Sequence, residues 1–396
     1  MKIKLALLFG GKTVEHEISI ISALQAKASF DTEKYDVIPI YISKEGDFYC
    51  GESIGNIEAY KNIDKLLAKS YKVTMARNNG RVEILRLKTK AFQKAFVDYV
   101  DVAFPVVHGT NVEDGTLAGY LHMLGLPYAG CDVLSSALGM DKYAMKVVFK
   151  DNGIPVLDCR TYQADDFNQN PNLVYLDVEK YFEYPVIVKP VNLGSSIGIS
   201  KASNRESLEN SLEDAFKYSK KVLVEKAIVN LTEINCSVLG DEHEAEASVC
   251  ERPINSDEIL SYSDKYLGGS KSSKGMASTQ RVIPADISAE STYQIRQLAV
   301  KAFKALGCNG VARIDFMIDN KTGKIYLNEI NTIPGSLSFY LWEPTGLSYT
   351  KLLDKVVTLA LKREREEQKV TYAFDTNVLA GIKLGGGTKG AKGAKM

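Results

Sequence analysis

The chain has few of the residue types that build disulfide frameworks, zinc sites or histidine-based catalysis. Its 396 residues include four histidines, and its six cysteines are scattered without a Cys-x-x-Cys pair. Scattered cysteines are typical of reduced thiols in a cytoplasmic protein, and the histidines and serines form no evident Ser-His-Asp order. We therefore expect no disulfide scaffold, no zinc site and no histidine-activated nucleophile.

Long apolar runs and a bias of charge are also missing. No stretch of 18 consecutive apolar residues exists, and the run Leu5 to Phe9 is too short for the core of a signal peptide. Lys+Arg and Asp+Glu both number 49, so no net charge favours nucleic acid or an anionic membrane. We expect a cytoplasmic protein with no membrane span and no nucleic-acid partner.

What the chain does contain is the composition of an ordinary globular protein, with 45% hydrophobic and 25% charged residues. Its length allows two or three domains. A buried-strand pattern from Ile3 to Phe9 is followed by Gly10-Gly11 and a helical stretch from about Val14 to Phe30. A second apolar run covers Val102 to Val107. This order of elements predicts an α/β fold that begins with a parallel sheet and continues with mixed strand and helix.

Breaks in the pattern divide the chain into units. Leu126 to Gly130 marks a boundary, a helical stretch follows from Ser135 to Asn152, and a last helix covers Leu347 to Glu367. The ending LGGGTKGAKGAKM has a composition typical of disorder. We therefore expect an N-terminal α/β domain, a central unit, a C-terminal unit and a basic Gly/Lys-rich tail, at residues 1–130, 131–225, 226–367 and 368–396.

The most informative stretch is VARIDFMIDNKTGKIYLNEINTIPG, residues 311–335, which predicts two strands joined by a polar turn. Side chains alternate between the faces of a strand, so Arg313 and Asp315 share one face, and Glu329 and Asn331 share a face of the partner strand. If these faces align, two carboxylates and an amide oxygen meet beside an arginine, and such oxygens suit Mg²⁺. From this segment alone, a hairpin with one solvated face is an equally good interpretation.

Lys189 to Gly198, KPVNLGSSIG, is a second segment with binding chemistry. Glycines let backbone N–H groups approach an anion, the hydroxyls of Ser195 and Ser196 add donors, and Lys189 adds a positive charge. These groups suit a triphosphate, although the spacing is not that of a Walker A loop. An ordinary hairpin connection is the alternative.

Weaker signals flank these segments. Glu225 and Lys226 end an apolar strand, where backbone groups and a carboxylate suit an adenine, and Glu233 suits a ribose; a solvated strand end is the alternative. Lys265 and Tyr266 precede LGGSKSSKGMASTQR, a stretch long enough for a lid over phosphoryl chemistry, or for a plain mobile loop.

Two residues follow predicted strands at the N-terminal sheet. His108 lies at a strand end, where α/β sheets bind ligands, although a structural histidine fits equally well. Glu15 follows the first glycine turn, and an acid in the first turn of a helix is its alternative explanation.

Taken in order, several segments resemble the D-alanine–D-alanine ligase family of ATP-grasp carboxylate–amine ligases. The resemblance covers about residues 3–360, and its carriers are LFGGKTVEHEIS, FPVVHGTNVEDGTLAGYLHMLGLPYAG, SALGMDK, VIVKPVNLGSSIG, SYSDKY and RIDFM…YLNEINTIPG. It implies a three-domain ATP-grasp architecture with a Rossmann-like N-terminal domain. It also implies ATP-dependent joining of two D-alanines through a D-alanyl phosphate, for peptidoglycan precursors, in a homodimer.

The resemblance assigns roles to individual residues. Two Mg²⁺ ions, with Mn²⁺ able to substitute, would be held by Asp315, Glu329 and Asn331. The remaining ATP contacts would come from Lys142, Lys189, Ser195, Ser196, Glu225, Lys226 and Glu233. Glu15 would anchor the ammonium of the first D-alanine, and His108 would lie beside its carboxylate. Arg313 and the amide of Gly335 would face the tetrahedral intermediate, and Lys265 with Tyr266 would form the lid pair.

Departures from the family pattern concern mainly the acceptor. Asn230-Leu231-Thr232 replaces a usual Gly-Arg pair before Glu233, the lid segment is longer than usual, and Ser338 is a displaced candidate for the acceptor's carboxylate. Tyr266 favours an amine acceptor over D-lactate. D-Alanine is therefore expected, with D-serine or another amino acid as the alternative. A nucleotide-binding partner protein without ligase activity is the third hypothesis.

Overall fold

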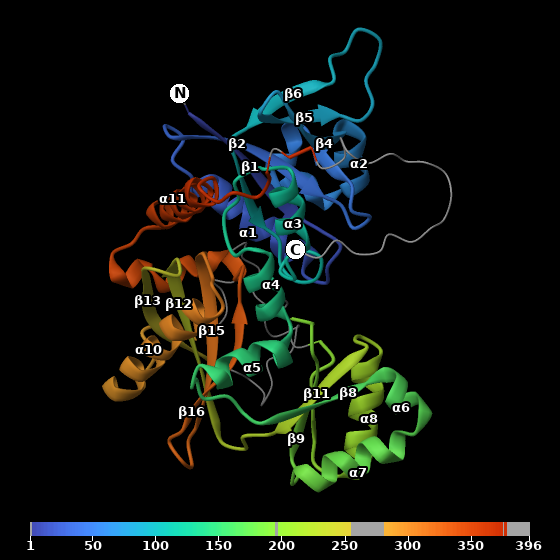
Figure 1. Cartoon of the computed structure of the whole chain (residues 1–396), viewed down its shortest axis with the longest axis vertical. Coiled ribbons are helices and arrows are strands. Elements are labelled where there is room, and N and C mark those ends of the chain that lie inside the picture. Colours follow the sequence, from blue (N-terminus) through green and yellow to red (C-terminus); the bar gives the residue numbers. More distant parts are fainter. Residues whose placement is uncertain (1, 195–196, 255–280, 375, 378–396) are drawn as a thin grey trace.

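The computed structural model describes residues 2–194, 197–254, 281–374 and 376–377. Within these ranges the chain forms three β-sheets with helices packed against them (Figure 1). The N-terminal sheet occupies one end of the long axis, and the central and C-terminal sheets lie beside each other toward the other end. This arrangement confirms the mixed α/β class.

The N-terminal unit contains a seven-stranded sheet in the order β6-β5-β4-β3-β2-β1-β7. Strand β1 pairs in parallel with β2 and β7, as the sequence predicts, whereas β2 to β6 continue the sheet as an antiparallel meander. Its elements are β1 (Ile3–Gly10), α1 (His16–Ser29), β2 (Tyr35–Ile42), β3 (Phe48–Cys50), the short helices Glu52–Gly55 and Ile57–Lys61, α2 (Ile63–Lys69), β4 (Tyr71–Asn78), β5 (Arg81–Arg86), β6 (Phe96–Val100), β7 (Val102–Val106) and α3 (Thr116–Met123).

The central unit is a four-stranded sheet in the order β10-β9-β11-β8, covered by helices on one side. Strands β9 and β10 pair in antiparallel fashion on either side of the Gly/Ser loop, so the predicted strand–loop–strand is present. Its elements are β8 (Cys159–Gln163), α6 (Ala164–Gln169), α7 (Pro171–Tyr181), β9 (Val186–Pro190), β10 (Ser200–Ala202), α8 (Arg205–Phe216) and β11 (Lys221–Lys226).

The C-terminal unit is a five-stranded sheet in the order β14-β13-β12-β15-β16. The predicted hairpin is the pair β15–β16, and β12 runs antiparallel along the other side of β15. Its elements are β12 (Leu231–Gly240), β13 (Ala245–Pro253), β14 (Arg281–Val282), α10 (Ala289–Ala305), β15 (Gly310–Asp319), β16 (Ile325–Asn331), the short helices Gly335–Leu341 (η4) and Glu343–Thr345, and α11 (Tyr349–Glu367).

The stretch expected as one helix from residue 135 to 152 forms two, α4 (Val133–Met140) and α5 (Lys142–Asp151). Asp141 interrupts it with an extended backbone and caps α5, accepting hydrogen bonds from two backbone N–H groups of its first turn. Met145 and Phe149 of α5 are buried in the same core as the C-terminal sheet. The cores thus place α5 with the C-terminal unit, although its sequence position lies in the expected central unit.

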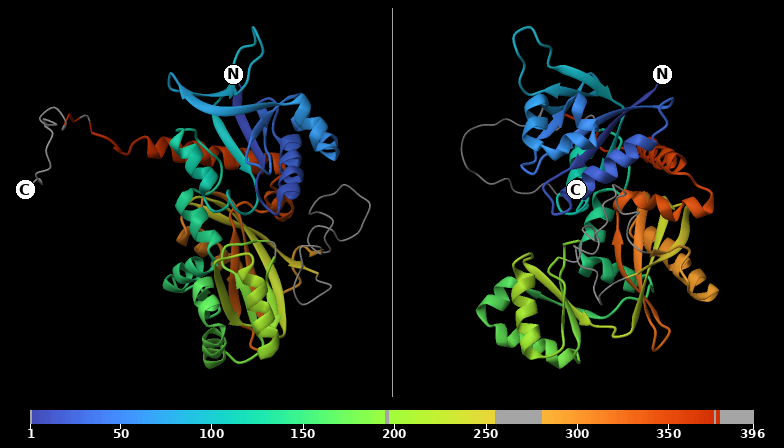
Figure 2. Two further views of the ribbon diagram at one scale, coloured as in Figure 1. Left: turned by 90° about the vertical axis from the view of Figure 1, so that its right-hand side faces the viewer. Right: turned by 180° about the vertical axis from the view of Figure 1, so that it is seen from behind.

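Helix α11 packs against both the N-terminal and the C-terminal sheets. It crosses the middle of the structure below the N-terminal sheet, as the side view shows (Figure 2). Leu352, Leu353 and Val356 share a buried core with strands β1 and β7. The same helix contacts β12 and β15. It therefore holds the sheet with the hairpin against the N-terminal sheet.

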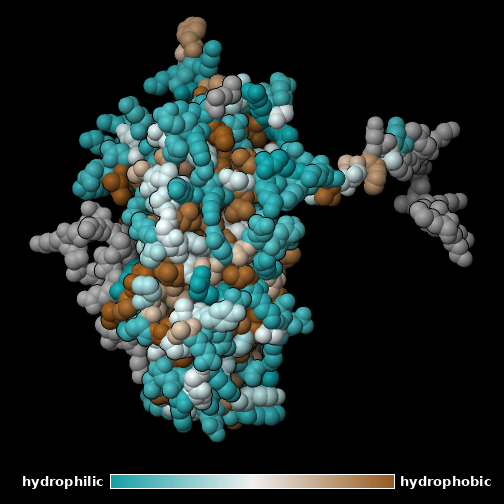
Figure 3. Space-filling model, turned by 90° about the vertical axis from the view of Figure 1, so that its left-hand side faces the viewer, coloured by the Kyte–Doolittle hydropathy of each residue, from teal (hydrophilic) through white to brown (hydrophobic). Residues whose placement is uncertain are grey.

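The surface is polar over most of the face seen in Figure 3, where apolar residues are dispersed among hydrophilic ones. Scattered apolar residues of this kind are normal for a protein surface in water. Among the helices of the described ranges, none combines the length and apolar character needed to cross a membrane.

Candidate active site

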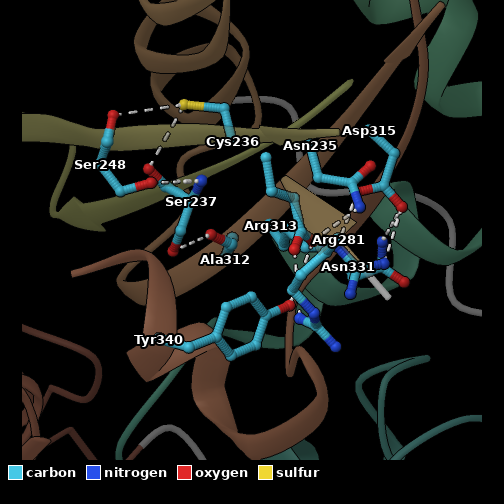
Figure 4. Close-up of polar contacts among 11 residues, drawn as sticks. Asn235, Cys236, Ser237, Ser248, Arg281, Ala312, Arg313, Asp315, Asn331 and Tyr340 are labelled. Carbon is cyan, nitrogen blue, oxygen red and sulfur yellow. Dashed lines mark hydrogen bonds and ion pairs between the residues drawn. The ribbon is translucent and has the colours of Figure 1, made fainter. Parts of the chain in front are cut away.

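The polar faces of the hairpin meet, as the alternation of β15 and β16 predicts. Asp315 lies opposite Glu329 and Arg313 opposite Asn331, with an irregularity in the register just after Asp315. Arg313 donates two hydrogen bonds to Asp315, of 2.7 and 2.8 Å, and Asn331 donates one of 3.0 Å to the same carboxylate (Figure 4). The intervening residue Ile314 is fully buried on the opposite face.

Lys142 connects this cluster to the Gly/Ser loop. It is the first residue of α5, and its Nζ lies 3.4 Å from Glu329 Oε2. The same Nζ donates a 2.8 Å hydrogen bond to the carbonyl of Leu193. A buried cation thus stands between one of the two hairpin acids and the loop that is expected to bind phosphate.

Glu225 is buried at the end of β11 between two lysines. Its carboxylate lies 2.7 Å from Lys146 Nζ and 2.5 Å from Lys189 Nζ. Burial alone would raise the pKa of this carboxyl, but the two ammonium groups outweigh it and lower the pKa to about 2. Glu225 is therefore ionised, and it fixes the position of Lys189, which also contacts Asn328.

A cavity of about 390 Å³ lies between the central and C-terminal sheets. This volume is in the range of small-molecule and cofactor sites. Its lining brings together residues that are far apart in the sequence and that were expected at the site: Lys189, Glu225, Lys226, Glu233, Arg313, Asp315 and Glu329.

Glu15 lies where the N-terminal unit meets the Gly/Ser loop. It is buried, and it precedes α1 without capping that helix through its side chain. A Cβ added to Gly194 would lie 3.3 Å from Glu15 Oε2, and one added to Gly109 would lie 3.2 Å from it. Glycine at these two positions therefore leaves room around a carboxylate that faces the loop.

Glu113 was not identified from the sequence. It lies in the loop after His108, where its side-chain carboxyl group accepts hydrogen bonds from the N–H of Gly109, at 2.6 Å, and of Ile333, at 3.0 Å. Burial and the nearby Glu15 carboxylate raise its pKa to about 8. The acid in the segment NVEDG was the available signal, but only the fold shows that it reaches the C-terminal unit.

His108 uses both ring nitrogens within the protein. Nδ1 lies 2.7 Å from the carbonyl oxygen of Ile333, and Nε2 lies 3.1 Å from Ser22 Oγ. Burial lowers the pKa of the imidazole, because the charged ring loses hydration. The neutral ring must therefore carry its proton on Nδ1, since a carbonyl oxygen can only accept.

The segment after Gly335 turns sharply. Ser336, Leu337 and Ser338 all have left-handed backbones, with φ of 50°, 53° and 50°. Ser338 is fully buried, and its Oγ has no hydrogen-bond partner in the described part of the chain.

A second polar cluster that the sequence did not reveal lies beside Arg313. Glu251 of β13 accepts hydrogen bonds from Asn235 at 2.9 Å, Arg281 at 3.1 Å and Tyr340 at 3.2 Å. The Arg281 guanidinium stacks on the Tyr340 ring, 4.2 Å from its centre (Figure 4). The four residues come from four separate elements, so no local pattern joined them.

The remaining expected residues, Ser195, Ser196, Lys265 and Tyr266, lie outside the described residues. For the metal, the hairpin offers two carboxylates and one amide on neighbouring strands, which are the hard oxygen donors that Mg²⁺ prefers. Within the described ranges, no three His, Cys, Asp or Glu side chains are placed so that they could hold a metal ion by themselves. The donor set therefore fits a divalent cation that completes its shell with phosphate oxygens and water.

Comparison with known proteins decides the family. The model described as "D-ala D-ala ligase N-terminus" matches residues 4–131, and "D-ala D-ala ligase C-terminus" matches residues 148–358. The chain belongs to the D-alanine–D-alanine ligase family. A family relative, the D-alanine–D-alanine ligase of Thermosipho melanesiensis, is 39% identical over 97% of this chain and 99% of its own length. The D-alanine–D-alanine ligase of Caldicellulosiruptor bescii is 40% identical over 94% of this chain and 99% of its own length.

Solved structures of the ligase family share the fold. The D-alanine–D-alanine ligase of Coxiella burnetii superposes with a TM-score of 0.76 at 31% identity, and covers 93% of this chain and 96% of its own. The VanG D-Ala:D-Ser ligase of Enterococcus faecalis has the same TM-score at 33% identity, with coverages of 91% and 100%. Both similarities extend over the three sheets, so the ATP-grasp architecture is present.

Proposed function

We propose that this protein joins two D-alanine molecules at the expense of ATP, giving D-alanyl-D-alanine for peptidoglycan precursors. The observation that carries this conclusion is the hairpin face of Arg313, Asp315, Glu329 and Asn331. Arg313, Asp315 and Glu329 line the cavity between the central and C-terminal sheets. Curated D-alanine–D-alanine ligases match nearly the whole chain around this site.

The nucleotide occupies the cavity, with the adenine and ribose near Glu225, Lys226 and Glu233 and the triphosphate toward the hairpin. Lys142 and Lys189 contact the phosphates, together with Ser195 and Ser196. Asp315, Glu329 and Asn331 would hold two Mg²⁺ ions, for which Mn²⁺ would substitute. Bound there, the metal ions neutralise charge on the phosphate oxygens.

Two steps follow from this placement. The first D-alanine binds with its ammonium at Glu15 and its carboxylate near His108. This carboxylate attacks the γ-phosphorus of ATP, and ADP leaves. The amine of the second D-alanine, with one proton lost, then attacks the carbonyl carbon, and phosphate leaves. Arg313 and the Gly335 N–H stabilise the oxygen charge of the tetrahedral intermediate. Lys265 and Tyr266 close the lid, and Ser338 receives the acceptor's carboxylate.

A D-serine acceptor is the second candidate, because the similar VanG structure is that of a D-Ala:D-Ser ligase. The two acceptors differ by one hydroxyl group on the side chain. Another amino-acid acceptor is a third possibility that the same experiment separates.

The deciding experiment measures phosphate release from ATP with D-alanine alone, and then with D-alanine plus D-serine or D-lactate, with the product masses determined. We expect D-alanine-dependent phosphate release, the mass of D-alanyl-D-alanine and no depsipeptide with D-lactate. A mixed D-Ala-D-Ser product formed in preference would reassign the acceptor. ATP turnover that no D-amino acid stimulates would contradict the assignment.

Beyond the reaction, we propose a homodimer in the cytoplasm with the four sequence units at 1–130, 131–225, 226–367 and 368–396. The dimer rests on resemblance to the family, and the location on the six free cysteines, which suit a reducing compartment. Light scattering coupled to size-exclusion chromatography measures the dimer directly, as a mass near twice 43.6 kDa.

A further inference from the structure

The turn that carries Gly335 is held from the N-terminal unit on both sides. Ile333, two residues before Gly335, donates its N–H to Glu113 at 3.0 Å and accepts at its carbonyl from His108 at 2.7 Å. Ser336, one residue after it, donates its N–H to Ser22 Oγ at 3.0 Å. The three groups that hold the turn thus belong to α1 and to the loop after β7.

The hydrogen bonds have a defined direction. His108 carries its proton on Nδ1, so Nε2 accepts, and the hydroxyl of Ser22 is the donor to it. With its proton committed in this way, Ser22 Oγ accepts the N–H of Ser336. Three hydrogen bonds therefore connect the Ile333 carbonyl to His108, His108 to Ser22, and Ser22 to the Ser336 N–H. The Ser22 hydroxyl connects His108 to Ser336.

The backbone between the two anchors has little freedom. Pro334 fixes its own φ, and its carbonyl accepts the N–H of Leu337 at 2.8 Å. Ser336 begins a run of three left-handed residues, a conformation that persists only when surrounding contacts enforce it. The side chain of Ser336 adds a 2.7 Å hydrogen bond to Gln25 on α1. The direction of the Gly335 N–H is therefore set by contacts from another unit.

We propose that Ser22 and Glu113 are positioning residues for the ligation step, which hold Ile333 and Ser336 so that the Gly335 N–H points at the oxygen that becomes negative in the tetrahedral intermediate. This inference rests on the proposed function, in which Gly335 serves the second step. Neither residue touches the reacting atoms in this role. Both act through the turn.

The test separates the two steps of the reaction in Ser22→Ala and Glu113→Gln. Scrambling of ¹⁸O from the β–γ bridge of ATP, driven by D-alanine, reports acyl-phosphate formation, and dipeptide release reports ligation. The ratio of ligation to scrambling cancels any change in donor binding, because both processes need the bound donor. We expect this ratio to fall about 10- to 100-fold in both variants, since small displacements of a catalytic group have costs of this size.

Matched controls come from the same elements. Ser19 is a buried serine on α1 whose side chain, among the described residues, bonds to Gly10 and Val106 of the N-terminal unit. Asp114 is an acid next to Glu113 that bonds within its own loop. Ser19→Ala and Asp114→Asn should keep the wild-type ratio, even where the melting temperature falls.

An unchanged ratio in either Ser22→Ala or Glu113→Gln would overturn the proposal, as would an equal fall in the controls. If one variant fails to fold, the other decides. Wild-type protein that shows neither scrambling nor dipeptide with D-alanine would instead contradict the proposed function.

Discussion

Single residues of this site act through charge that is held away from water. Arg313 and Asp315 form a two-bond ion pair on one strand, with the side chains only 12% and 14% exposed, and Glu225 forms ion pairs with two buried lysines. Hydrogen bonds between charged groups in such surroundings are stronger and more directional than neutral ones. Substitutions that keep size but change the bonding pattern therefore test each role best.

Arg313→Lys keeps the positive charge but removes the planar pair of donors. We expect kcat/KM for D-alanine to fall about 100-fold, which corresponds to about 3 kcal/mol of transition-state stabilisation. Steady-state phosphate release measures it. Arg205→Lys, which alters a two-bond pair with Glu179 on the surface, should leave the rate unchanged. Similar rates for Arg313→Lys and wild type would exclude Arg313 from the transition state.

Glu225→Gln leaves two buried lysines without their counter-ion. We expect a loss of about 3 kcal/mol in unfolding free energy at pH 7, because breaking a buried ion cluster costs 3–5 kcal/mol. The folded pKa of about 2 lies below the ordinary value of 4.5, so this contribution is complete above pH 4.5 and declines as the pH falls toward 2.

Thermal unfolding at pH 7 and pH 4 checks both parts of this prediction. The gap between wild type and Glu225→Gln should narrow by about 1 kcal/mol at pH 4. Glu179→Gln, at a more exposed ion pair with Arg205, is the control and should show a much smaller gap. A gap that widens on acidification would show that the sign is wrong.

At the scale of elements, the site depends on where strands and turns end. The hairpin β15–β16 carries the polar face, and η4 follows it within four residues. The left-handed run from Ser336 to Ser338 has no glycine, so it carries a conformational cost of roughly 1 kcal/mol per residue. Such local strain is common at functional sites.

Ser338→Ala tests this turn and the acceptor together. It removes a buried hydroxyl that lacks a partner in the described part of the chain, so we expect stability to rise by about 1 kcal/mol. If Ser338 receives the acceptor's carboxylate, the KM for the second D-alanine should rise while that for the first is unchanged. Initial rates over a wide range of D-alanine concentrations separate the two constants. Two unchanged constants would remove Ser338 from the acceptor site.

At the scale of the whole molecule, α11 and the hydrogen bonds at the Gly335 turn hold the N-terminal sheet against the C-terminal sheet. Arg363 on α11 donates hydrogen bonds of 2.7 Å to the carbonyl of Gly130 and of 2.6 Å to that of Tyr128, and stacks on the Tyr128 ring. These carbonyls lie where the chain leaves the N-terminal unit. The arginine therefore fixes the crossing point between units.

Arg363→Ala should lower the unfolding free energy by about 2 kcal/mol, because two charge-assisted hydrogen bonds are lost. We expect the KM for ATP to stay the same, since the cavity lies away from α11. Denaturant unfolding and ATP-dependent kinetics measure the two quantities. Arg365→Ala, an exposed arginine on the same helix, is the control. Equal stability of both variants would show that the crossing point does not depend on Arg363.

Local sequence patterns predicted several elements of this protein and the family to which it belongs. The alternation of Arg313, Asp315, Glu329 and Asn331 predicted a shared polar face, because side-chain direction in a strand repeats every two residues. The order of motifs predicted the family, which the comparisons confirmed. The prediction of a single helix from residue 135 to 152 was wrong at Asp141, because the side chain of this residue caps a second helix there.

What the sequence determined by itself is the set of elements and the chemical character of their faces, since both depend on residues a few positions apart. The tertiary structure decided which distant residues meet. Only the packing of α1 and of the loop after β7 against the Gly335 turn brings Ser22 and Glu113 to it. The sheet order and the fold of η4 together bring Glu251 and Tyr340 beside Arg313. Such contacts join segments separated by tens to hundreds of residues, and no local periodicity encodes them.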